Sequence, residues 1–341
     1  MERALRSGSH RTRVEAGGTM SRVAVLVPSY NHVQFVSESI GSVRAQTFQD
    51  WNLLAIDDRS NDGSAKLLRE LEGDQISILE NESNLGTYGT LERALNGSES
   101  EYVAILNSDD VWAPTKLARQ VEALDHHPEV AFCYTLGRKI DSRGNPDPST
   151  DMHADWPKGE IQELLPYLLT ENRVLASGVL FRRSCLRFRS DLRYSGDWVA
   201  LLDAALVGKA VCIPEILTFW RMHEHNTFRR SPGQVAEEIR VRQSILAARD
   251  AWVVRDITLP EVSKALSTCA MHLSALLVLE GRLREARIAA RFAARQAPSR
   301  ASIRRLLAVS LPASMAHRSL WHSEATLQPS PESDLVAFGN T

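Results

Sequence analysis

Short apolar runs alternate with longer amphipathic stretches from residue 22 onward, and this alternation constrains the fold more than any other feature of the chain. Strand, helix and strand repeated in this way are typical of a parallel sheet whose crossover connections are helices. We therefore predict an α/β fold. The predicted strands are residues 23–27, 53–56, 76–79, 102–106 and 130–134.

Apolar residues at helical intervals predict the helices that join these strands. They fall at residues 35–46, 65–71, 91–95 and 115–124. Residues 138–160 are rich in proline and polar side chains without periodicity, so we predict a long loop that could act as a lid. Beyond it we expect a helix at 161–169, a strand at 179–182, a helix at 197–207 and short strands near Val211 and Leu217.

The composition changes beyond Pro232 to alanine, arginine and leucine in helical patterns at 262–279, 283–296 and 303–311. The longest apolar stretch there is interrupted by His272, and we expect it to be too short to cross a bilayer. We divide the chain into a disordered leader (1–20), an α/β domain (21–230), a helical C-terminal region (231–315) and a disordered tail (316–341).

The 341-residue chain has a formal net charge of −2 and a pI near 6.6, so its overall charge does not favour nucleic acid as a partner. Its four cysteines lie far apart without a C-x-x-C pair, which favours a reducing cytoplasm and no zinc site. The arginine-rich helices near residues 282–305 leave two alternatives open. They contact the inner face of a membrane peripherally, or they are a solvated face, which is the commoner case.

Polar motifs follow each of the first four predicted strands. They are VPSYNH (27–32), IDDRSNDGS (56–64), NESNLGTYG (81–89) and LNSDDVW (106–112). Ligands of open parallel sheets bind outside the carboxyl ends of the strands. We therefore expect these four motifs to face one site.

Two acidic pairs lie in these motifs. Asp109 and Asp110 end a strand that we predict to be buried, where two like charges are costly unless a cation compensates them. Their oxygen atoms suit Mg²⁺ or Mn²⁺ bridging to a diphosphate. The alternative is that Asp110 caps the helix near Pro114. Asp57 and Asp58 have a similar alternative as turn or cap residues, but the shared sheet edge favours a ligand.

Three segments, in order, resemble the nucleotide-binding half of family 2 inverting glycosyltransferases. They are VAVLVPSYNHVQFVSESIGSVRAQTFQDWNLLAIDDRSNDGS, then NLG, then YVAILNSDDVW. The resemblance extends from about Arg22 to His223 and leaves the C-terminal helices outside it. It implies a GT-A type α/β fold, with a mostly parallel twisted sheet flanked by helices, followed here by an α-helical appendage.

By position, the resemblance implies a nucleotide-sugar site at the first three motifs. Pro28 and Tyr30 would line the nucleoside pocket, with Tyr30 against the base. Asp58 would hydrogen-bond the edge of the base. Asn84 and Gly86 would shape the floor near the donor.

The resemblance also implies roles around the diphosphate. Asp109 would contact the ribose, and Asp110 would bind Mn²⁺ or Mg²⁺ on the diphosphate. The segment TFWRMHEHN resembles the closing loop of the family. Arg221 would then neutralise phosphate charge and His223 would ligate the metal. A polar surface turn is the alternative for His223 and for His225.

The segment YSGDWVALLDAAL resembles the part of the family in which an acidic residue before an aromatic residue is the catalytic base. This resemblance assigns the base to Asp197. Inverting transfer needs one carboxylate to remove the proton of the acceptor hydroxyl as its oxygen attacks the anomeric carbon. The alternative is that Asp197 caps the apolar helix at 198–207.

These implications add up to a cytoplasmic glycosyltransferase. We expect metal-dependent transfer, with inversion, from a UDP- or dTDP-linked sugar to a saccharide, lipid-linked or other hydroxyl acceptor. A dinucleotide-dependent oxidoreductase is disfavoured because no G-x-G-x-x-G follows the first strand. The remaining alternative is a catalytically inactive glycosyltransferase-like protein that serves as a binding or assembly subunit.

Overall fold

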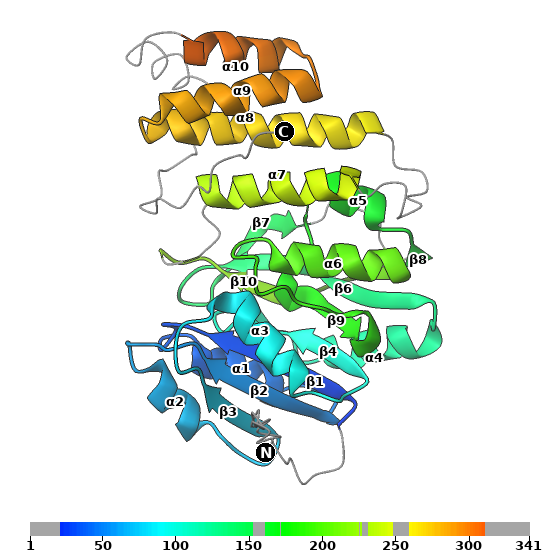
Figure 1. Cartoon of the computed structure of the whole chain (residues 1–341). Helices are drawn as coiled ribbons and strands as arrows, with labels where there is room; N and C mark the ends of the chain where they lie inside the picture. The colour runs from blue at the N-terminus through cyan, green and yellow to red at the C-terminus, as the bar shows by residue number, and fades with distance from the viewer. Residues whose placement is uncertain are drawn as a thin grey trace, which may run out of the picture.

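The computed structural model describes residues 21–152, 161–170, 172–224, 226, 231–247 and 259–310. In this part of the chain, a sheet flanked by helices is followed by a stack of C-terminal helices (Figure 1). The expected leader and tail, residues 1–20 and 316–341, lie outside the described residues, as do His225 and residues 153–160 of the expected loop.

The first half of the sheet is entirely parallel, with strand order β3-β2-β1-β4. Its strands are β1 (Val23–Ser29), β2 (Trp51–Asp57), β3 (Ile76–Glu80) and β4 (Tyr102–Ile105). The helices of the α/β region are α1 (Val36–Arg44), α2 (Ser64–Glu70), α3 (Gly86–Asn96), α4 (Lys116–His126), α5 (Leu165–Thr170) and α6 (Gly196–Val207). This arrangement confirms the predicted α/β class.

The second half of the sheet is mixed. Its strands are β5 (Val111–Trp112), β6 (Val130–Ile140), β7 (Pro146–Met152), β8 (Ile161–Gln162), β9 (Val179–Arg182) and β10 (Lys209–Arg221). Strand β9 lies antiparallel between β4 and β6, whereas β6 and β10 are parallel. The sheet of ten described strands is therefore less uniformly parallel than expected.

Three local predictions in this second half were wrong. Residues 138–152 form an antiparallel pair, β6 with β7, instead of part of a loop, because Asp141 closes a tight turn with the backbone of Asn145. Residues expected to begin a helix at 161 first form β8, and α5 follows it. The two short strands expected near Val211 and Leu217 are one long strand, β10, in which register shifts interrupt the apolar pattern.

Side chains of β1 alternate between two buried clusters, because successive strand residues face opposite sides of a sheet. Val23, Val25 and Val27 pack on the side of α1, α2 and α4. Ala24 and Leu26 pack on the side of α3 and α6. The parallel strands are thus apolar on both faces, which leaves only their ends for polar chemistry.

The C-terminal helices stack on the α6 side of the sheet (Figure 1). They are α7 (Pro232–Ala247), α8 (Leu259–Leu279), α9 (Leu283–Gln296) and α10 (Arg300–Ser310). Helix α7 is bound firmly to the α/β region, because buried Arg242 donates to the carbonyls of Leu169 and Thr170 and lies over the ring of Trp198. The apolar core on this side continues from the sheet through α6 into α8 and α9.

One apolar window in α8, Val262–Leu279, has a mean hydropathy of 1.5 and is long enough to cross a membrane. The expectation that no apolar stretch reaches this length was therefore wrong. In the structure, 56% of the window is buried. The hydroxyls of Ser267 and Ser274 donate to carbonyls of α9, so the window packs here as a core helix.

Candidate active site

Asp58 follows β2 and is buried against the start of α3. Its carboxylate accepts hydrogen bonds from the backbone N–H groups of Leu85 and Gly86 at 2.7 and 2.8 Å, and from the Asn81 amide at 2.7 Å. Asn84 donates to the backbone carbonyl of Asp58. Asp58 therefore holds the loop before α3, and does not cap α2.

The loop after β1 carries Tyr30 beside this point. Pro28 is buried in β1, whereas Tyr30 is 46% exposed and presents an aromatic ring at the sheet edge. Asn31 has a positive φ of 55° and is hydrogen-bonded to Ser60 and Asn61. The loops after β1 and β2 are thus joined, and the exposed ring lies next to the carboxyl ends of both strands.

Asp110 lies inside the protein and does not cap a helix. Its carboxylate accepts a 2.5 Å hydrogen bond from the Ser177 hydroxyl and a 3.1 Å hydrogen bond from the backbone N–H of Arg221. Helix α4 begins only at Lys116. Burial, and then the charge of neighbouring Asp109, raises the pKa of Asp110 to about 8.

Arg221, at the end of β10, is buried behind this acidic pair. Its Nε donates to the carbonyl of Asp109 at 2.8 Å, and its Nη2 forms an ion pair with Glu38 of α1 at 2.6 Å. The guanidinium also lies over the Phe35 ring, 5.2 Å from its centroid. Through these contacts, Arg221 connects the end of β10 to α1 and to the loop that carries Asp109. Its contact with a diphosphate stays a prediction.

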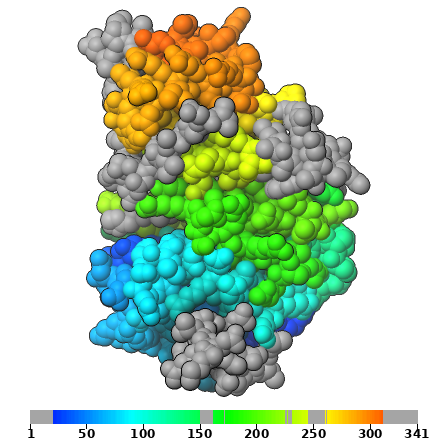
Figure 2. All heavy atoms as spheres, viewed as in Figure 1, coloured from blue at the N-terminus to red at the C-terminus, as the bar shows by residue number. Residues whose placement is uncertain are grey.

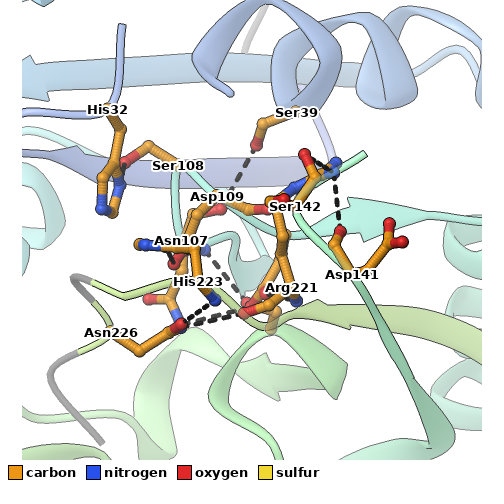
Figure 3. Close-up of polar contacts among 12 residues, drawn as sticks. His32, Ser39, Asn107, Ser108, Asp109, Asp141, Ser142, Arg221, His223 and Asn226 are labelled. Atoms are coloured by element: carbon orange, nitrogen blue, oxygen red, sulfur yellow. Dashed lines mark hydrogen bonds and ion pairs between the residues drawn. The ribbon is translucent and has the colours of Figure 1, made fainter. Parts of the chain in front are cut away.

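His32, Asp109 and His223 form a group that could hold a metal ion, with ligand atoms within 4.8 Å of one another (Figure 3). Nε2 of His223 lies 3.0 Å from a carboxylate oxygen of Asp109, and Nδ1 of His32 lies 2.8 Å from the Ser108 hydroxyl. Two imidazoles and one carboxylate suit Mn²⁺ better than Mg²⁺, which prefers oxygen ligands. Asp110 is outside this group, so its role as metal ligand stays a prediction.

His32 was not singled out from the sequence, although it lies in the VPSYNH motif. A histidine just past the carboxyl end of a parallel strand is the signal that could have identified it. Its ring also meets the His223 ring edge-on, with centroids 5.4 Å apart. The first motif of the chain is therefore in contact with a residue that follows β10.

Asp197 is the second residue of α6, and Ser195, not Asp197, is the N-cap residue. Its Oδ1 accepts hydrogen bonds from the Tyr88 hydroxyl at 3.0 Å and from the backbone N–H of Trp198 at 2.8 Å. Burial raises the pKa of the Asp197 carboxyl above its ordinary value. Gly196 permits this contact, because a Cβ there would lie 2.4 Å from the Tyr88 ring.

Glu237 of α7 holds the turn that leads to Asp197. Its buried carboxylate accepts hydrogen bonds from the backbone N–H groups of Arg193, Tyr194 and Ser195 at 2.9, 2.9 and 2.7 Å. No sequence signal marks this role, because Glu237 is one of two adjacent glutamates in an ordinary helical pattern. A C-terminal helix therefore fixes the position of the predicted base.

The first turn of α3 links the predicted donor residues to the predicted base. Gly86 is bound by Asp58, and two residues later Tyr88 reaches Asp197. On the other side, Asp109 is bound to both Arg221 and His223. The predicted residues thus lie at strand ends and helix starts on one edge of the sheet. They form two hydrogen-bonded groups, one around Asp58 and Asp197 and one around Asp109.

The family model described as glycosyl transferase family 2 matches residues 24–191. An uncharacterized glycosyltransferase of Nostoc sp. is 28% identical over 229 residues, covering 64% of this chain and 70% of that protein. UDP-Glc:alpha-D-GlcNAc-diphosphoundecaprenol beta-1,3-glucosyltransferase WfgD of Escherichia coli is 36% identical over 112 residues, covering 33% of this chain and 44% of that protein.

A solved structure shows the same fold. TarS residues 1–349 of S. aureus in complex with UDP superposes with a TM-score of 0.60 at 18% identity, covering 92% of this chain and 94% of TarS 1–349. The likeness therefore includes the C-terminal helices as well as the sheet. The matched family model, the glycosyltransferase relatives and the GT-A fold together show that this chain belongs to glycosyl transferase family 2.

Proposed function

We propose that this protein transfers a sugar from a nucleotide-sugar donor to an acceptor hydroxyl with inversion at the anomeric carbon. The observation that carries this proposal is the hydrogen-bonded connection from Asp58 through Tyr88 to Asp197. It supports a donor-side carboxylate and a base-side carboxylate acting at one sheet edge. A family 2 glycosyltransferase needs both, one for recognition of the donor and one for activation of the acceptor.

The donor that we propose is a UDP- or dTDP-linked sugar. The name of the E. coli relative gives UDP-Glc as its donor, and TarS has been crystallised with UDP and with UDP-GlcNAc. In this chain, Tyr30 would stack on the base, with Pro28 beneath it and Asp58 at the polar edge of the base. Asn84 and Gly86 would shape the floor, and Asp109 would meet the ribose.

For the acceptor, we propose a saccharide or a lipid-linked saccharide. The E. coli relative is named for a GlcNAc-diphosphoundecaprenol acceptor, and a Bacillus subtilis relative is a putative teichuronic acid biosynthesis glycosyltransferase. We place the reaction in the cytoplasm. The four cysteines all lie within the described residues and form no disulfide there, which is compatible with a reducing compartment.

We further propose that His32, Asp109 and His223 hold Mn²⁺, and that Asp110, the next residue after Asp109, adds a ligand. A bound divalent ion would neutralise charge on the leaving diphosphate. Two imidazoles and one carboxylate lie together at this position, with ligand atoms within 4.8 Å of one another. Arg221 donates to the backbone carbonyl of Asp109 and is ion-paired with Glu38, so it would hold the Asp109 loop in position.

Asp197 would remove the proton from the acceptor hydroxyl as that oxygen attacks the anomeric carbon. Its raised pKa makes it a stronger base than an exposed aspartate. Tyr88 donates to one carboxylate oxygen, which would leave the other for the acceptor hydroxyl. Because one carboxylate suffices for direct displacement, no covalent enzyme intermediate is required.

The test is donor turnover by the purified full chain with a panel of UDP- and dTDP-sugars, with and without Mn²⁺. We expect release of the nucleoside diphosphate that depends on Mn²⁺ and on Asp197. The competing function, an inactive binding subunit, is favoured if a donor binds but neither transfer nor hydrolysis occurs with any sugar. If the wild-type chain bound none of these donors, both the transferase and the donor-binding subunit would be contradicted.

A further inference from the structure

The exposed faces of α9 and α10 combine arginines with large apolar side chains at helical spacing. On α9, exposed residues recur at intervals of four, three and four: Arg284, Ile288, Arg291 and Arg295. On α10, the exposed side chains include Arg300, Ile303, Arg304 and Leu307. We call these eight residues the α9–α10 face. Ile288, Ile303 and Leu307 are 48%, 50% and 65% exposed.

The two helices form an antiparallel pair, so their exposed faces belong to one end of the molecule. Nε of Arg287, near the start of α9, donates to the carbonyl of Val309 at the end of α10. Buried alanines of α9, such as Ala286 and Ala293, face the protein. Figure 2 shows this pair at the end of the molecule away from β1, β2 and β3.

The charge of this end is strongly biased. Residues 281–310 contain eight arginines and one acidic residue, Glu285, whereas the whole chain carries a net charge of −2. The ion pairs of Glu285 within the described residues go to Arg282, which is not part of the face. The five arginines of the α9–α10 face make no ion pair with any residue that the structure describes. They therefore form a concentrated positive surface on a chain that is otherwise acidic.

A solvated arginine face explains the charge but not the three exposed apolar side chains between the arginines. An anionic bilayer accounts for both, because its headgroups attract arginine and its interfacial region accepts Ile and Leu. We infer that the α9–α10 face docks this protein on the surface of a membrane that contains anionic lipid. This inference is independent of the proposed sugar transfer, since it involves none of the site residues.

The experiment is flotation of the full chain with vesicles of pure phosphatidylcholine or of phosphatidylcholine mixed with phosphatidylglycerol. We expect binding only to the anionic vesicles, with release in about 1 M salt, where the Debye length falls to about 3 Å. Each arginine near an anionic surface contributes about fivefold to binding. Arg284→Gln, Arg291→Gln and Arg295→Gln combined should therefore weaken vesicle binding about a hundredfold.

The matched control carries Arg69→Gln, Arg119→Gln and Arg187→Gln, which remove the same charge from exposed positions elsewhere. It should bind the anionic vesicles as the wild type does. A second variant, Ile303→Ser with Leu307→Ser, should weaken binding about tenfold without changing the charge. All variants should keep the wild-type melting temperature, because the substituted side chains are exposed.

Four results would overturn the inference. The first is no binding to anionic vesicles, and the second is a loss of binding in the control equal to that in the arginine variant. The third is equal binding to neutral and anionic vesicles, and the fourth is binding only by a chain truncated after Ser310. The last would mean that residues 311–341 cover the face. Self-association that is lost in Ile303→Ser with Leu307→Ser, without vesicle binding, would assign the face to a second copy of the chain instead. Donor turnover measured in parallel tests the proposed function separately.

Discussion

The two halves of the sheet build their parts of the site in different ways. In the parallel half, the polar residues lie just past the ends of buried strands, as Asp58 does after β2 and Asp109 after β4. In the mixed half, Asp197 and His223 reach the same edge through a helix start and a strand end. Asp197 and His223 are each hydrogen-bonded to a side chain more than a hundred positions away in the sequence.

This difference shows how much of the site each half can position alone. Asp58 is fixed by backbone N–H groups fewer than thirty residues away. Asp197 depends on Tyr88 and on the turn held by Glu237, which belongs to the C-terminal helices. The proposed nucleoside end of the donor site is thus local to the parallel half, whereas the proposed base requires α7.

The largest expected effect separates these two sides by function. Asp197→Asn keeps the size and hydrogen bonds of the side chain but removes the base, so we expect transfer to fall about a thousandfold. Donor affinity should stay within about twofold, because the parallel half is untouched. Single-turnover kinetics beside calorimetric titration of the donor measures both. Full transfer by the variant would show that another group is the base.

Glu237→Gln should show that α7 supports the base side only. One carboxylate now accepts three backbone N–H groups, and a glutamine cannot replace both of its oxygens as acceptors. We expect a loss of about 2 kcal/mol in the free energy of unfolding. The maximal rate should also fall, while the KM for the donor is unchanged.

The matched control for this test is Glu122→Gln, an exposed glutamate on α4. Its effect on stability should be below about 0.5 kcal/mol. If Glu237→Gln weakened donor binding as much as it slowed turnover, the separation of the two halves would be wrong.

Gly196→Ala tests how tightly the two halves are packed at the contact between α3 and α6. The new Cβ would lie 2.4 Å from the Tyr88 ring, so the ring or the helix start must move. We expect a loss of about 1–3 kcal/mol in urea unfolding. Gly41→Ala is the control, because Gly41 lies inside α1 with nothing within 4 Å. It should be neutral or stabilising by up to about 1 kcal/mol.

Stability should also depend on pH through Asp110. The pKa of this carboxyl is raised from 3.8 to about 8, so ionisation opposes folding and stability declines as pH rises between these values. Asp110→Asn cannot ionise and should flatten this decline. Urea midpoints at pH 5 and pH 8, in the presence of a chelator, measure it. Exposed Asp74→Asn should keep the wild-type slope, and an unchanged slope in Asp110→Asn would contradict the assignment.

The sequence predicted the parallel half well because its signals are local. A buried strand, a polar motif and a helix follow one another, so strand ends identify candidate residues without any knowledge of distant contacts. The same reasoning failed for residues 138–152, where β7 is polar and pairs with β6 at the sheet margin. An edge strand needs no apolar alternation, and its composition resembles a loop.

The supporting contacts of the site could not be predicted for a related reason. Tyr88, Glu237 and Ser177 act on residues that are at least 42 positions away in the chain. No local pattern marks such residues, because a tyrosine, a glutamate or a serine fits many helical and loop environments. Arg221 shows the opposite case, since the family resemblance gave it a ligand-facing role whereas its guanidinium is buried among protein acceptors.

Calorimetric titration of UDP in the presence of Mn²⁺ most directly tests whether Asp109, in the parallel half, serves the donor while Asp197, in the mixed half, serves only the acceptor. The wild-type chain and Asp197→Asn should bind UDP with equal affinity. Asp109→Ala should bind at least about a hundredfold more weakly, because it loses a residue shared by the ribose and metal positions. Unchanged binding in Asp109→Ala, or equal loss in Asp197→Asn, would contradict the division of the site between the two halves of the sheet.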